Sequence, residues 1–425
     1  MLIVFALLAL TLLAAANRYL WQRLFRDTTR GPGRARRGGA TLLAGGWALA
    51  IGALVAERAG APFRLQQVLA WPGFLWLALS VYLLLAVLAG ELVRPLLRRL
   101  LERRARAAAP AEAVPAPAPA PAGPDPVPVA AGRAGEATPG PPPTTLPAAA
   151  PDPSRRLFVS RVVAGAAAAA AVGTVGYGTY GVLRGPRVKR VTVPLAKLPR
   201  AAHGSRIAVV SDIHLSPVLG RDFAQKVVDT INGTQPDLIA VVGDLVDGSV
   251  KDLGPAAAPL ARLRARHGSY FVTGNHEYFS GAGQWVEEVR RLGLDPLENA
   301  RTELPWFDLA GVNDIAGESE GQGPDFARAL GDRDTARACV LLAHQPVQIH
   351  DAVRHGVDLQ LSGHTHGGQL WPGSLVAAAA NPTVAGLERY GDTQLYVSRG
   401  AGAWGPPTRV GAPSDITVVQ LASTR

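Results

Sequence analysis

"RIAVVSDIHLS", residues 206–216, joins a short apolar run to a polar turn that carries Asp212 and His214. Four further apolar runs follow in the second half of the chain, and Asp, Asn or His comes within two residues after each. These runs are "DLIAVV" at 237–242, "SYFVT" at 269–273, "ACVLLA" at 338–343 and "VDLQLS" at 357–362. Short apolar runs that alternate with amphipathic stretches are typical of strands interleaved with helices. The sequence therefore predicts a layered α/β domain beyond about residue 200.

The polar residues after these runs are candidates for a functional site, because loops at the carboxyl ends of strands converge over a rigid sheet. In chain order they are Asp212, His214, Asp244, Asp247, Asn275, His276, His344, His364 and His366. Each alone has an ordinary explanation as a turn residue, a helix cap or a hydrogen-bonded side chain. Five of the nine histidines of the chain are among them, however, and this shared position favours one common site.

The stretch "LSGHTHGGQLWPGS", residues 361–374, places His364 and His366 one residue apart between glycines. Residues i and i+2 of an extended segment share a face. We therefore expect an extended segment that points both imidazoles into one site. The glycines suit such a site, because they permit unusual backbone angles and close approach to a ligand.

The residue types indicate a site for two metal ions. Two divalent cations about 3.5–4 Å apart can clamp a displacement at phosphorus, and a carboxylate with two oxygens can bridge them. Neutral imidazoles complete such a site without quenching the Lewis acidity of the cations. The lone Cys339 excludes a site made of thiolates alone.

The order and spacing of these blocks resemble the calcineurin-like metallophosphoesterase superfamily over roughly 205–422. The blocks are Asp212-x-His214, Gly243-Asp244-x-x-Asp247, Gly274-Asn275-His276-Glu277, His344 and Gly363-His364-x-His366. The segments "GHTHGGQ" and "LYVSRGAG", the latter at 395–402, further resemble a bacterial branch of membrane-anchored or exported phosphoesterases. The resemblance implies a two-sheet α/β sandwich with the site at the strand ends on one edge.

The resemblance also implies a role for each candidate. It assigns seven of them as metal ligands. Asp212, His214 and His366 would bind one cation, Asn275, His344 and His364 would bind the other, and Asp244 would bridge the two. It gives His276 the role of protonating the leaving oxygen or stabilising the transition state, with Asp247 orienting it. The cations would be Mn, Fe or Zn, since these ligand types do not separate them. A phosphate ester would then be hydrolysed by a metal-activated hydroxide.

Three other residues near these motifs have less certain roles. Glu277 follows the catalytic candidate and is expected at most to support its neighbours. Arg399 and Arg409 are considered either as contacts to phosphate or as surface and ion-paired residues.

The first half of the chain predicts a membrane domain. Apolar segments at roughly 1–20, 40–56 and 70–92 are long enough to cross a bilayer, which takes about 20 residues. The first could instead be a secretory signal, and "SRRLFV" at 154–159 resembles a twin-arginine export signal. The predicted organisation is three transmembrane helices at 1–106, a disordered Ala/Pro-rich linker at 107–153, a fourth transmembrane helix or twin-arginine-like signal anchor at 154–183, and a metallophosphoesterase domain at 200–425.

The charge distribution predicts the orientation of the chain. The formal charge is +10, but residues 1–200 carry 25 Lys/Arg against 8 Asp/Glu, whereas residues 201–425 carry 18 against 25. The connection "NRYLWQRLFRDTTRGPGRARRGG" at 17–39 carries seven arginines, and basic residues adjacent to apolar segments stay in the cytoplasm. We therefore expect a multi-pass membrane protein whose catalytic domain is extracytoplasmic.

The same distribution bears on the partners. A nuclease on this scaffold should show a basic catalytic half, so no nucleic-acid partner is expected. A non-catalytic membrane sensor is the other alternative, but a sensor would be expected to lack at least one of the seven ligands. The substrate class favoured by the location is a phosphate ester, especially a phosphodiester, of the cell envelope or of a lipid-linked kind.

Overall fold

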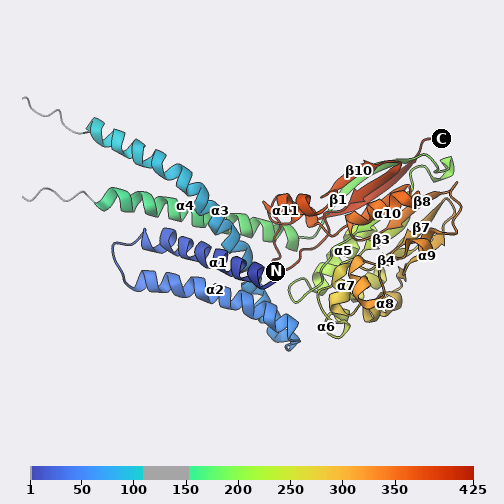
Figure 1. Cartoon of the computed structure of the whole chain (residues 1–425), viewed down its shortest axis with the longest axis horizontal. Coiled ribbons are helices and arrows are strands. Elements are labelled where there is room, and N and C mark those ends of the chain that lie inside the picture. The colour runs from blue at the N-terminus through green and yellow to red at the C-terminus, as the bar shows by residue number, and fades with distance from the viewer. Residues whose placement is uncertain (1, 109–152) are drawn as a thin grey trace, which may run out of the picture.

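A computed structural model of the chain describes residues 2–108 and 153–425 (Figure 1). The N-terminal part consists of long helices that run beside one another away from a compact α/β domain (Figure 1). These are α1 (Leu2–Trp21), α2 (Arg34–Arg58), α3 (Phe63–Ala108) and α4 (Pro153–Leu183), with a short π-helical turn, η1 (Gln22–Arg26), after α1. Helices α2 and α3 pack closely, since a Cβ on Gly73 would lie 2.7 Å from the carbonyl oxygen of Leu49.

Three stretches of these helices are long and apolar enough to cross a membrane: 34–58, 63–104 and 155–183. The segment expected at 1–20 forms α1. Helices α2 and α3 extend well beyond the expected apolar segments into arginine-rich sequence, because Ala, Leu and Arg are all strong helix formers. The linker expected at 107–153 lies outside the described residues, apart from its two ends.

The second part of the chain forms two six-stranded sheets. The first has the order β1 (Arg187–Leu195), β12 (Asp415–Ser423), β2 (Arg206–Val210), β3 (Leu238–Val242), β4 (Ser269–Val272) and β5 (Asp295–Pro296). The second has the order β10 (Gly386–Tyr390), β11 (Thr393–Val397), β9 (Leu359–Ser362), β8 (Ala338–Leu342), β7 (Phe307–Gly311) and β6 (Ala300–Glu303). The prediction of a two-sheet α/β sandwich is confirmed.

Helices cover the outer faces of both sheets. They are α5 (Arg221–Gly233), α6 (Val250–Ala257), α8 (Ala282–Arg291), α9 (Phe326–Leu330) and α10 (Ile349–Arg354). The domain also contains α7 (Asn275–Ser280) and α11 (Gly373–Ala380). Short 3₁₀ turns join these elements: η2 (Arg200–Ala202), η3 (Ala258–Arg262), η4 (Ile315–Glu320), η5 (Pro346–Gln348) and η6 (His366–Gly368). Phe223 and Val227 of α5 pack on the outer face of β2 and β3, and Ile349 of α10 packs on β8.

The core between the sheets explains the apolar runs in the sequence. Val209 and Val242 of the first sheet meet Leu309, Val340 and Leu361 of the second, and all five are at most 2% exposed. Because β2, β3 and β4 are parallel neighbours, as are β7, β8 and β9, the carboxyl ends of these strands reach one edge of the sandwich. The five expected strands all form, each within two residues of its expected bounds.

Candidate metal centre

The candidate residues lie in turns with an unusual backbone. Asp212, His214, Asp244, His364 and His366 all have φ between 48° and 71°, in the left-handed region. They are five of the eight non-glycine residues with positive φ among residues 2–108 and 153–425. Such a conformation costs on the order of 1–3 kcal/mol per residue and gathers at functional sites, where the surrounding structure enforces it.

The first cluster follows β2 and β9 and contains Asp212, His214 and His366. Its ligand atoms all lie within 4.8 Å of one another, and the three residues are buried. The Nε2 atoms of His214 and His366 are 3.0 Å apart, and Nε2 of His366 lies 3.4 Å from Oδ1 of Asp212. This convergence of two imidazole nitrogens and a carboxylate is a donor set that suits a borderline divalent cation.

The second cluster contains Asp244, His344 and His364, again with ligand atoms within 4.8 Å of one another. Oδ2 of Asp244 lies 3.2 Å from Nε2 of His344. Asn275 joins the cluster, since its Oδ1 is 3.0 Å from Nδ1 of His364. Oδ2 of Asp244 is also 3.7 Å from Nε2 of His214, so this carboxylate lies between the two clusters.

The charges of the neighbours suit cation binding by these groups. Burial lowers the pKa of His364 to about 4, and the nearby His344 contributes to the shift, so the His364 imidazole is neutral at physiological pH. Burial, His214 and Arg409 together lower the pKa of His366 in the same way. For Asp244, burial opposes ionisation, but the charges of His344 and His214 outweigh burial and lower its pKa. The site therefore offers neutral imidazoles at His364 and His366 beside an ionised carboxylate. Burial lowers the pKa of His214 and His344, but nearby carboxylates more than offset this and raise it, so cation binding by these two displaces protons.

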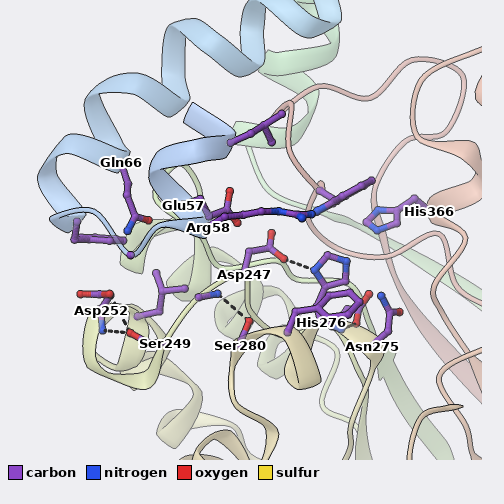
Figure 2. A pocket seen from close by; sticks show the side chains of 18 of the residues that line it. Glu57, Arg58, Gln66, Asp247, Ser249, Asp252, Asn275, His276, Ser280 and His366 are labelled. Carbon is purple, nitrogen blue, oxygen red and sulfur yellow. Dashed lines mark hydrogen bonds and ion pairs between the residues drawn. The ribbon is translucent and has the colours of Figure 1, made fainter. Parts of the chain in front are cut away.

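His276 and Asp247 form a pair beside the clusters. Nδ1 of His276 lies 2.7 Å from Oδ1 of Asp247, and the same oxygen is 2.9 Å from Nδ1 of His214. Burial lowers the pKa of His276, but the hydrogen bond to Asp247 and the charge of Asp244 more than offset this and raise it to about 9. Figure 2 shows His276 and Asp247 side by side at the wall of a cavity, with Asn275 and His366 nearby.

The expectation of an extended segment at His364 and His366 was wrong. Both have positive φ, of 71° and 51°, and Thr365 between them is in the right-handed helical region. The hydroxyl of Thr365 holds this turn, since it donates to the carbonyl of Val384 and accepts from the amide of Gly367. The two imidazoles therefore enter different clusters from one tight turn.

Glu277 supports the site more directly than its sequence position indicated. It is fully buried, and its carboxylate accepts hydrogen bonds from the amides of Asp244, Leu245 and Gly274. Burial and the charge of Asp244 raise its pKa to about 7. The sequence signal was available, because a glutamate in the first turn of a helix commonly reaches back to an amide at the helix start.

Arg409 is neither a surface residue nor a group on the open side of the site. It is 6% exposed and lies behind His366, with its Nη2 3.0 Å from Nδ1 of that residue. Its guanidinium also donates to the carbonyls of Gly402, His366 and Ala412. Arg409 therefore holds the loop that carries His366.

Replacing Arg409 by Met should weaken cation binding at the first cluster about 10–100-fold, the usual cost of losing a group that orients a ligand. The measurement is isothermal titration calorimetry of the full-length variant with the metal ion. Arg389→Met, a change of an exposed arginine on β10, serves as the control. Unaltered affinity for both cations in Arg409→Met would show that His366 needs no such support.

Comparisons with known proteins agree with this geometry. Residues 205–368 match the family described as calcineurin-like phosphoesterase. A transmembrane protein with metallophosphoesterase domain from Danio rerio is 39% identical over 259 residues, which cover 58% of this chain and 59% of the relative. The chain thus spans about three fifths of the length of that relative.

Two bacterial relatives are covered almost completely. An uncharacterized metallophosphoesterase of Aquifex aeolicus is 35% identical over 240 residues, covering 55% of this chain and 91% of the relative. Another, of Bacillus subtilis, is 30% identical over 285 residues, covering 64% of this chain and 98% of the relative. Together with the two clusters at the strand ends, these matches show that the chain belongs to the calcineurin-like metallophosphoesterase family.

Proposed function

We propose that the chain is a membrane-anchored phosphoesterase that uses two divalent cations to hydrolyse phosphate esters, in particular phosphodiesters of envelope or lipid-linked substrates. The observation that carries the proposal is the position of Asp244, whose carboxylate lies within 3.7 Å of imidazole nitrogens of both clusters. A single carboxylate between two sets of donors is the arrangement that a bridged pair of cations requires.

In this proposal the ligands divide between two cations, each of Mn, Fe or Zn. Asp212, His214 and His366 would hold one, Asn275, His344 and His364 would hold the other, and Asp244, which lies between the two clusters, would be shared by both. When bound, the cations lower the pKa of a water molecule toward about 7 and neutralise charge on the phosphate. The carboxylate, amide and imidazole donors of the two clusters suit divalent cations of this kind.

His276 acts as the general acid in this proposal. Because Nδ1 of its ring faces the Asp247 carboxylate, the ring is held with Nε2 free to give a proton to the leaving oxygen. Its side chain is 15% exposed, so it can reach a substrate in the cavity, whereas Asp212, His214 and His344 are fully buried.

In this proposal the site lies at a membrane surface, which the apolar helices and their flanking arginines support. Arginine-rich sequence follows α1 and fills the last turns of α3, at the ends of the helices far from the α/β domain (Figure 1). By the positive-inside rule these ends are cytoplasmic, which leaves the domain at 200–425 on the extracytoplasmic side. The four helices would form the membrane anchor, with the fourth at 154–183 leading into the catalytic domain.

Metal analysis and turnover of the purified full-length protein test the proposal. We expect two equivalents of divalent cation per chain and hydrolysis of bis(p-nitrophenyl) phosphate faster than of p-nitrophenyl phosphate. Chelation should lower the rate at least about 100-fold, and added Mn²⁺ should restore it. His350→Ala, a change of an exposed histidine outside the site, is the control. Unchanged turnover after complete removal of metal would contradict the proposal.

A further inference from the structure

The open side of the metal centre is covered by the connection between α2 and α3. A cavity of about 960 Å³ lies between the metal centre and this connection. Asp244, Asn275, His276 and His364 line its inner side, and Leu54, Glu57, Arg58, Gly60, Phe63 and Gln66 of the connection line the outer side. Figure 2 shows Glu57, Arg58 and Gln66 projecting from the helices above toward this space. The tip of the α2–α3 hairpin, residues 54–66, is therefore a wall of the candidate active site.

A second cavity of about 230 Å³ adjoins the first, since Leu54, Glu57, Asp247 and Trp404 line both. We refer to it as the apolar cavity, because most of its lining is hydrocarbon or aromatic. The lining contributed by such groups is Leu54, Phe74, Leu77, Pro217, Trp404 and Pro406. A polar cavity at the metal centre thus continues into an apolar one.

Trp404 stands at the junction of the two cavities. Its ring centroid lies 5.6 Å from that of His276. Its backbone is fixed by Gln369, whose side-chain amide accepts from the Trp404 amide and donates to the Trp404 carbonyl. Although its backbone is held, the Trp404 side chain is 58% exposed. An exposed indole held beside a catalytic imidazole suits contact with an apolar part of a substrate.

The apolar cavity leads to the part of α3 that is apolar enough to lie in a membrane. Phe74 and Leu77 belong to the 63–104 stretch, and Val218 of the catalytic domain packs on Phe74. The hydroxyl of Tyr82, further along α3, donates to the carbonyl of Trp371 just before α11. The α/β domain therefore lies directly on this helix.

Helix α11 gives independent support for a position at a lipid surface. Leu375 and Val376 on this helix are 69% and 73% exposed, and Trp371 beside it is 54% exposed. Leu370, which precedes this helix, packs against the cluster that contains Ala171 and Val175 of α4. An exposed apolar helix beside membrane-spanning segments is suited to the interface of a bilayer.

We infer that the substrate is an amphiphilic phosphate ester, whose phosphate lies at the metal centre and whose hydrocarbon chain lies in the apolar cavity between the α2–α3 hairpin and the catalytic domain. This inference rests on the proposed function and names its substrate class. A soluble, fully polar ester would gain nothing from the apolar cavity, whereas a hydrocarbon chain gains about 0.8 kcal/mol for each methylene taken out of water, equivalent to about fourfold in kcat/KM.

The test uses the full-length protein in lipid nanodiscs with Mn²⁺ and a series of p-nitrophenyl alkyl phosphates from methyl to octyl, below their micelle concentrations. Water attacks phosphorus, the bond to the aryl oxygen breaks, and p-nitrophenolate leaves with an alkyl phosphate as the other product. We expect kcat/KM to rise about fourfold with each methylene until the apolar cavity is full.

Two pairs of variants separate the apolar cavity from simple partition of the longer esters into lipid. Leu54→Trp and Leu77→Trp fill the cavity and should lower the octyl-to-methyl ratio of kcat/KM at least about tenfold. Ile51→Trp and Val81→Trp are the matched controls on the same helices, 54% and 40% exposed and outside the lining of both cavities, and should keep the wild-type ratio. Leu54 is 45% exposed, so its variant can fold even if Leu77→Trp cannot.

Two results would overturn the inference but leave the proposed function standing. One is hydrolysis of every ester with no dependence on chain length, and the other is an octyl-to-methyl ratio that falls equally in the controls. Failure to hydrolyse any ester in the presence of metal would remove the proposed function and the inference with it.

Discussion

Asp244→Asn should no longer bind two cations per chain. It should also lower kcat/KM for bis(p-nitrophenyl) phosphate more than about 100-fold, because loss of a residue that only supports a metal ligand already costs up to about 100-fold in activity or metal affinity. The reason is the position of this carboxylate, 3.2 Å from His344 and 3.7 Å from His214. An amide has one oxygen in place of two and carries no negative charge, so it cannot bridge two cations. Metal content per chain and steady-state turnover are the measurements.

The control for Asp244→Asn must separate loss of the bridge from loss of the fold. Asp229→Asn on α5 makes the same chemical change at an exposed residue and should keep both cations and full activity. Thermal unfolding of both variants checks that the domain is intact. An Asp244→Asn protein that retained two cations and wild-type turnover would refute the assignment of the bridge.

His276→Ala should slow the hydrolysis of esters with poor leaving groups about 10²–10⁴-fold, the contribution expected of a general acid. The loss should be much smaller for p-nitrophenyl esters, since p-nitrophenolate leaves without protonation. Both cations should remain, because His276 pairs with Asp247 and belongs neither to the Asp212–His214–His366 cluster nor to the Asp244–His344–His364 cluster. The measurement is kcat for a series of phosphodiesters of graded leaving-group pKa, beside metal content.

Asp247→Asn provides the comparison for the same pair. Because Oδ1 of Asp247 contacts both His276 and His214, this variant should show the leaving-group effect and also weaker cation binding. Equal losses across all leaving groups in His276→Ala would show that His276 shapes the site and does not donate a proton.

The sequence predicted a layered α/β domain and the residues at the ends of its strands because both depend on local patterns, whereas the two-sheet sandwich followed from the resemblance to the family. A buried strand requires a run of apolar residues, as at 238–242, where every side chain is buried. The turn after such a strand must accommodate unusual backbone angles, so the glycines near Asp244 could also be recognised from the sequence as part of the turn. A Cβ on Gly274 would collide with the carboxylate of Asp244, and this explains why the turn has no side chain there. The catalytic and ligand roles of these residues remain predictions.

Other features depended on contacts between distant segments and could not be predicted in this way. β1 pairs in parallel with β12, although more than two hundred residues separate them. Arg409 gave no local sign that it would support His366, because that contact depends on how two loops pack. The wall formed by the α2–α3 hairpin is the largest such case, since Leu54 and Trp404 meet only in the folded chain.

The short passage from α4 to the catalytic domain has a kinetic consequence. Only residues 184–186 separate Leu183 from β1, and Thr179 of α4 hydrogen-bonds to Thr408 of the domain. An enzyme joined so closely to its anchor has no tether on which to sample the surrounding solution. Under the proposed function, encounter with substrate would then be confined to two dimensions, and the rate would depend on the mole fraction of the ester within the same membrane.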